Sequence, residues 1–104
     1  MKIQFNTDKT ILGDERNEHY FTAQIEEGLR HFKSHITRIE VHLSDQNGKK
    51  EGVKDILCML EARIEDRKPI AVSCKSDTVE QAVTNAIDKL KTAIETIMDR
   101  SQNR

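Results

Sequence analysis

Aromatic side chains are scarce in this sequence of 104 residues, which has no Trp, one Tyr and three Phe. A sheet that reads single-stranded RNA presents aromatic side chains on which bases stack, so the sequence disfavours that kind of recognition. Glycine is also sparse, and the four glycines are scattered at positions 13, 28, 48 and 52. Phosphate-binding loops need clustered glycines, so a nucleotide-binding loop of this type is excluded.

Cysteine and long apolar runs are also nearly absent. Cys58 and Cys74 could form one disulfide at most, and neither stands beside a His in a way that indicates a nucleophile. We expect both thiols to be reduced and buried. No run of 18 apolar residues occurs, and residues 1–6 contain no apolar segment typical of a secretion signal. We therefore expect a cytoplasmic protein that does not bind a membrane.

Charge of one sign is not in excess, because 17 Lys and Arg residues face 18 Asp and Glu residues for a net charge of −1. This balance excludes a histone-like polycation, so any binding of a polyanion must depend on charges segregated on one face. Apolar residues nevertheless recur with regular periods, which separates the chain from disordered charged tails. We expect one globular domain over residues 1–104.

Four segments alternate polar and apolar residues with the period of a half-buried strand. They comprise residues 2–6, a segment beginning at Thr37, a segment around residues 58–65, and a segment that begins at Pro69 and ends near Lys75. Proline is tolerated at the first position of a strand because its missing amide donor is not needed there. Residues 46–52, which include Asn47, Gly48, Lys49 and Lys50, are expected to form a basic loop between the second and third strands. The expected inward-facing residues are Ile3, Phe5, Ile39, Val41, Leu43, Cys58, Leu60, Ala62, Ile64, Ile70, Val72 and Cys74.

Two segments have the 3.6-residue period of an amphipathic helix. The first is expected over residues 15–34 with Asp14 as its N-cap, and Gly28 within it suggests close packing on a sheet. The second is expected to begin after Asp77, which with Glu80 has the form of a capping box, and to end near residues 98–100. The fold class is therefore α+β with the order β-α-β-β-β-α, a four-stranded mixed sheet, and both helices on one face.

The open face of this sheet carries charged side chains on neighbouring strands: Arg38, Glu40, His42, Glu61 and Arg63. The favoured interpretation is a set of cross-strand ion pairs. The alternative is a surface for a protein partner or a second copy of the chain, which would make the protein an adaptor or a homodimer.

Basic residues on the helices and the long loop could follow a phosphate backbone, but acidic residues lie among them, so a solvated helix surface is the simpler interpretation. The basic residues are Arg30, Lys33, Lys89, Lys91, Arg100, Lys49 and Lys50. His31 and His35 are four residues apart and could bind a metal from one helix face, but spacing supplies no further ligand. We expect no metal, cofactor, small-molecule substrate or catalytic activity.

Four sequence segments taken together carry a resemblance to a known family. They are ITRIEVHLSD at residues 36–45, CMLEAR at 58–63, PIAV at 69–72 and DKL at 88–90. Together they resemble the short bacterial ribosome-associated proteins of the hibernation-promoting factor and ribosome-associated inhibitor family, over essentially the whole chain. The resemblance implies a fold similar to a double-stranded-RNA-binding domain with an added strand. It also implies binding to the small ribosomal subunit near the decoding centre, where messenger and transfer RNA are blocked and ribosomes are stored during stress.

Members of that family contact ribosomal RNA with basic residues on both helices. By this resemblance Arg30 and Lys33 match the basic end of the first helix, and Lys89 matches the lysine of the DKL segment. After Leu90 the sequence departs from the family pattern, since further basic positions are occupied by Thr92, Glu95, Thr96 and Asp99. Lys91 and Arg100 are partial substitutes for them.

Overall fold

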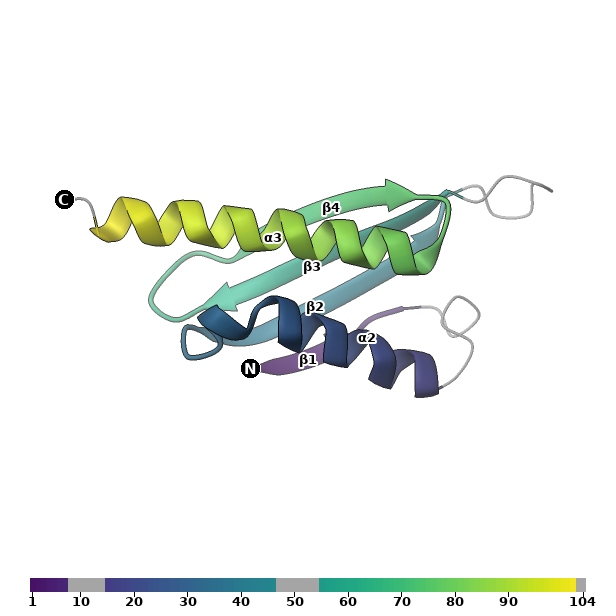
Figure 1. Cartoon of the computed structure of the whole chain (residues 1–104), viewed down its shortest axis with the longest axis horizontal. Coiled ribbons are helices and arrows are strands. Elements are labelled where there is room, and N and C mark those ends of the chain that lie inside the picture. The colour runs from purple at the N-terminus through teal and green to yellow at the C-terminus, as the bar shows by residue number, and fades with distance from the viewer. Residues whose placement is uncertain (8–14, 47–54, 103–104) are drawn as a thin grey trace.

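A computed structural model describes residues 1–7, 15–46 and 55–102 of the chain, and its elements follow the predicted order (Figure 1). Asp14, Lys49, Lys50 and the Asn47-Gly48 pair lie outside the described residues. The elements are β1 (Lys2–Phe5), α2 (Glu15–Gly28), the 3₁₀ turn η1 (Arg30–Phe32), β2 (Ile36–Asp45), β3 (Ile56–Ile64), β4 (Ile70–Ser76) and α3 (Val79–Gln102). None of the described helices is long and apolar enough to cross a membrane.

The strands form one mixed sheet in the spatial order β1-β2-β3-β4. β1 is parallel to β2, and both β3 pairings are antiparallel. The register places Ile3 beside Ile39, and Leu60 between Val41 and Val72. Because side chains alternate between the two faces of a strand, this register gathers the apolar residues on one face of the sheet. The predicted fold class is confirmed.

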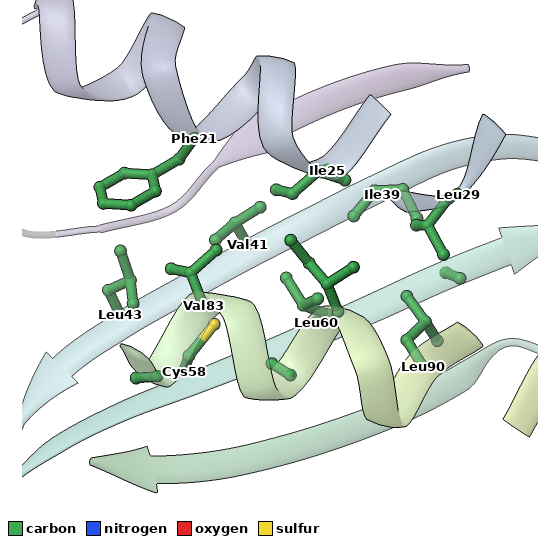
Figure 2. Packing of buried hydrophobic residues seen from close by; sticks show 14 of the residues in the cluster. Phe21, Ile25, Leu29, Ile39, Val41, Leu43, Cys58, Leu60, Val83 and Leu90 are labelled. Atoms are coloured by element: carbon green, nitrogen blue, oxygen red, sulfur yellow. The ribbon is translucent and has the colours of Figure 1, made fainter. Parts of the chain in front are cut away.

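Both helices cover that apolar face, and the core lies between the two layers (Figures 1 and 2). Ile25 from α2, Leu29 just after it and Leu90 from α3 are fully buried there, as are Ile39 and Leu60 of the sheet. Full burial of each such side chain contributes about 1.5 to 3 kcal/mol, so these residues hold the helices on the sheet. The remaining core residues are Phe21, Ile36, Val41, Leu43, Ile56, Cys58, Ala62, Ile64, Ala82, Val83, Ala86, Ile87 and Ile94.

The first helix is shorter than predicted, because the α-helix ends at Gly28 instead of Ser34. Leu29 leaves the helical conformation with φ −110° and ψ 15°, and the chain then tightens into η1 before it enters β2. The apolar spacing from Leu29 to Phe32 is three residues, which suits a 3₁₀ turn as well as an α-helix. Periodicity therefore could not distinguish the two conformations.

The N-cap of α3 lies one residue later than predicted. The helix begins at Val79, and the backbone N–H of Gln81 donates to Oγ1 of Thr78 at 3.1 Å. Thr78 is thus the capping residue, and Asp77 precedes it. The helix also continues to Gln102, beyond the predicted end.

Three further predictions are corrected in detail. β4 begins at Ile70, so Pro69 precedes the strand. Cys58 is buried but Cys74 is only half-buried, because it belongs to the edge strand β4; both thiols are free. Gly28 packs closely on Ile87 of α3 instead of on the sheet, since a Cβ at Gly28 would lie 2.5 Å from Cγ2 of Ile87.

Candidate functional site

Two of the predicted RNA-binding residues lie where α2 passes into β2. Arg30 begins η1, Lys33 follows it, and both side chains are exposed. Arg30 Nη1 lies 3.7 Å from Oε1 of Glu27, a pair in which both side chains are mostly exposed. Such an exposed pair is weak and leaves the guanidinium available to another anion. The backbone N–H of Lys33 donates to the carbonyl of Arg30 at 3.3 Å, but its side chain has no hydrogen-bond or ion-pair partner among the described residues.

Lys89 and Lys91 lie on different flanks of α3. Residues two positions apart on a helix do not share a face. Nζ of Lys89 donates to the carbonyl of Ser73 at 3.1 Å, so this side chain lies against the edge strand β4. Lys91 follows Ile87 by four residues and therefore lies on the flank that faces α2.

The structure therefore places Arg30 and Lys33 between α2 and β2 and separates Lys91 from Lys89 around the axis of α3. Arg100 lies in the last turns of α3.

The open face of the sheet carries an ion-pair network centred on Glu40. Oε2 of Glu40 lies 3.3 Å from Nη2 of Arg38 and 3.8 Å from Nε of Arg63, and Oε1 accepts from the side-chain amide of Asn6 at 2.9 Å. Nη2 of Arg63 also lies 3.9 Å from Oε1 of Glu61. Like charges face each other directly in the register, Arg38 with Arg63 and Glu40 with Glu61, so the favourable contacts run along the strands and on the diagonal.

This environment favours the ionised form of Glu40. Desolvation alone would raise its pKa, but the hydrogen bond from Asn6 and the charges of Arg38 and Arg63 outweigh that effect and lower it. One of the predicted cross-strand ion pairs is present, between Arg63 of β3 and Glu40 of β2, whereas the Arg38–Glu40 and Glu61–Arg63 contacts lie within one strand. His42 is the register partner of Met59, a partly exposed apolar residue. Use of this face by a protein partner stays a prediction.

Titratable side chains do not assemble into a metal site in the described part of the chain. No group of three or more His, Cys, Asp or Glu residues there could hold a metal ion. His31 lies in η1 and His35 beyond it, so the spacing of four does not place them on one face of an α-helix. Burial and the neighbouring Cys74 raise the pKa of Cys58 to about 12, which leaves almost none of its thiol ionised at neutral pH.

A groove between α2 and α3 was not predicted from the sequence. It has a volume of about 410 Å³ and is lined by Tyr20, Ala23, Gln24, Glu27, Gly28, Thr84, Ile87 and Asp88. The hydroxyl of Tyr20 donates to Oε1 of Glu80 at 2.9 Å and accepts from Nε2 of Gln24 at 2.8 Å, which links the two helices at one end of the groove. Gly28 was the one signal of this groove in the sequence, because a glycine inside a predicted helix often marks the close approach of another element.

The fold and these surfaces define a class of small α+β protein whose charged groups lie on open surfaces. The model of the family described as "Sigma 54 modulation protein / S30EA ribosomal protein" matches residues 14–102. The chain therefore belongs to this family.

Two solved structures share the fold over nearly their whole length. One is described as a ribosomal subunit interface protein from Coxiella burnetii, with a TM-score of 0.73 and 14% sequence identity over 95% of this chain and 99% of that one. The other is the Thermus thermophilus Protein Y N-terminal domain, with a TM-score of 0.72 and 15% identity over 93% of this chain and 99% of that one. None of the curated proteins compared with this chain gives a significant match.

Proposed function

We propose that this chain is a non-enzymatic, cytoplasmic ribosome-associated factor that binds ribosomal RNA of the small subunit near the decoding region and inhibits translation. The observation that carries the proposal is membership of the S30EA ribosomal protein family over residues 14–102. The description of the Coxiella burnetii protein as a ribosomal subunit interface protein supports the same assignment.

The basic residues that follow α2 are the main proposed RNA contacts. Arg30 and Lys33 are exposed at the surface, and Lys91 of α3 is the third proposed contact. A backbone phosphate can bind such groups without base recognition, which suits a protein with few aromatic residues. Lys89, Arg100, Lys49 and Lys50 are secondary candidates, and Lys89 would first have to release the Ser73 carbonyl.

Co-sedimentation with small ribosomal subunits at two salt concentrations tests this proposal. Contact with about three phosphates would reduce affinity roughly 20- to 40-fold between 50 and 200 mM salt, because displaced counterions drive the binding. The double variant Arg30→Gln/Lys33→Gln should lose binding and show a shallower salt dependence. Lys75→Gln removes one positive charge on the open sheet face, where Lys75 pairs with Asp55, and is the control.

Absence of the wild-type protein from the subunit fraction at 50 mM salt would refute ribosome binding. Salt-tolerant self-association without RNA would instead support the alternative function, a homodimer or adaptor that uses Arg38, Glu40, His42, Glu61 and Arg63.

A further inference from the structure

The two cysteines of the chain lie directly opposite each other in the sheet. Cys58 of β3 and Cys74 of β4 are register partners in an antiparallel pair, and the sequence contains no other cysteine. Side chains of directly opposite residues lie on the same face of a sheet, and here it is the face that both helices cover. The fold therefore brings together two free thiols from different strands.

The backbone hydrogen bonds define how closely these two residues approach. The N–H of Gln46 donates to the carbonyl of Asp55 at 2.8 Å, and the alternation along the register from this pair turns the backbone of Cys58 toward β4. Cys58 and Cys74 are thus a hydrogen-bonded pair, whose Cα atoms lie about 5.5 Å apart in an antiparallel ladder. The next carbonyl in β4, that of Ser73, faces outward and accepts from a lysine side chain, which agrees with this pairing.

This geometry permits a disulfide but does not leave it relaxed. A Cα separation of about 5.5 Å lies inside the range of about 4.4 to 6.8 Å that disulfides span. The Cβ atoms of opposite residues are about 4.5 to 5.5 Å apart, whereas a disulfide requires about 3.5 to 4.5 Å, so bond formation must draw the two strands together. Strained disulfides are easily reduced again. The pair therefore suits reversible oxidation better than a permanent cross-link.

The two thiols differ in their access to solvent, which separates their roles. Cys58 is fully buried among core side chains (Figure 2), and its raised pKa keeps it from reacting first. Cys74 is only half-buried on the edge strand β4, so a small oxidant reaches its sulfur. Only about one Cys58 thiol in 10⁵ is ionised at neutral pH, but a well-oriented intramolecular partner has an effective molarity of about 10⁵ M or more, which offsets this scarcity.

We propose that Cys58 and Cys74 form a modification site that hydrogen peroxide converts reversibly to a disulfide. The Cys74 thiolate attacks one peroxide oxygen, the O–O bond breaks, and the released hydroxide takes up the proton that this thiol lost, which leaves a sulfenic acid and one water. The Cys58 sulfur then attacks the Cys74 sulfur, the S–O bond breaks, and the departing hydroxide leaves with the Cys58 proton as a second water. Two electrons pass from the sulfurs to the peroxide. No RNA contact takes part, so the site goes beyond the proposed function.

Oxidation of the reduced protein with hydrogen peroxide, followed by intact-mass measurement, tests the proposal. The wild type should lose two hydrogen atoms, stay a monomer on a non-reducing gel and yield one cross-linked peptide that contains both cysteines, and reduced glutathione should restore both thiols. Cys58→Ala keeps only the accessible thiol and should accumulate a sulfenic acid that dimedone traps. Cys74→Ser keeps only the buried thiol and should react about tenfold more slowly than Cys58→Ala, with folding of both variants verified by circular dichroism.

The double variant Cys74→Ser/Val72→Cys is the matched control. It keeps two thiols on the same face of β3 and β4 but moves one of them to the position diagonal to Cys58, since Val72 lies opposite Leu60. Diagonal neighbours are about 7 to 8 Å apart, too far for a disulfide, so this variant should form one at least about tenfold more slowly than the wild type.

Equal rates of disulfide formation in the wild type and this control would overturn the proposal. A wild-type product that joins Cys74 to a second copy of the chain, or that carries a sulfinic acid at Cys74 beside a free Cys58 thiol, would also overturn it. A disulfide that reduced glutathione leaves intact would overturn its reversibility. The assay contains no ribosome, so its outcome does not depend on the proposed function.

Discussion

Replacement of Gly28 by Ala should destabilise the protein although it improves helix propensity. Gly28 is the last residue of α2 and has no positive φ that would require glycine. On propensity alone, Gly→Ala within a helix stabilises by up to about 1 kcal/mol. The new Cβ would, however, lie 2.5 Å from Cγ2 of Ile87, a distance so short that either the Ile87 side chain or one of the helices must shift.

The expected magnitude follows from two opposing effects. Overpacking in a well-packed interior costs about 1 to 3 kcal/mol, and Ile87 is a β-branched side chain with little freedom to move away. After the gain in propensity, we expect Gly28→Ala to reduce the free energy of unfolding by about 1 kcal/mol. For a chain of this size that corresponds to a fall in Tm of about 4 to 8 °C.

Urea unfolding followed by far-ultraviolet circular dichroism measures this effect in a double-mutant cycle. Ile87→Ala alone should cost about 2 to 5 kcal/mol because Ile87 is buried. The double variant Gly28→Ala/Ile87→Ala should lose about 1 to 2 kcal/mol less free energy of unfolding than the two single variants lose together, because without the Ile87 side chain the new Cβ has nothing to clash with.

An exposed position of the same helix provides the control. Ala23→Gly should destabilise by up to about 1 kcal/mol through propensity alone. A stabilisation of about 0.5 to 1 kcal/mol by Gly28→Ala, equal and opposite to this control, would refute the close approach of α2 to α3.

Three further predictions concern single contacts. Thr78→Ala should reduce the free energy of unfolding by about 1 kcal/mol, measured by thermal unfolding, because it removes the cap of α3; an equal loss in Asp77→Ala would contradict the observed cap. The hydrogen bond to Glu80, followed by desolvation and the Glu80 charge, raises the pKa of Tyr20 above 10.0, so Glu80→Gln should shift the 295 nm titration of this one tyrosine to lower pH. The folded-state pKa of Glu40 is lowered from 4.5, so its stabilising effect is present above about pH 4.5 and is lost as the pH falls through the folded-state value. The stability difference between wild type and Glu40→Gln should therefore shrink in acid unfolding series, and a constant difference would count against the network.

The prediction of the sheet from sequence succeeded because its strands have one apolar row each. The alternation at Ile39 and Val41 and again at Leu60 and Ala62 assigned the buried face, and all four side chains are fully buried. The predicted end of the first helix was wrong because an apolar spacing of three residues is compatible with both an α-helix and a 3₁₀ turn. The predicted cap of α3 was wrong by one residue because Asp77 and Thr78 are both good capping residues. Only the structure shows that Thr78 accepts the backbone hydrogen bond from Gln81.

The candidate sites depended more strongly on tertiary structure. The ion pairs of Arg38, Glu40, Glu61 and Arg63 could be predicted in kind, since side chains of opposite charge alternate on adjacent strands. Their actual pairing could not, because the register places like charges opposite each other and moves the attractive contacts to other positions.

By itself, the sequence determined the order of elements, the buried face of each strand and the family resemblance, because these follow from local periodicity and residue identity. Tertiary structure alone decided which side chains from distant segments meet. It placed Nζ of Lys89 against the Ser73 carbonyl of β4, and it joined Tyr20 to Glu80 across the two helices. The reason is geometric: the approach of Gly28 in α2 to Ile87 in α3 results from how both helices pack on the sheet, and neither helix sequence alone contains that distance.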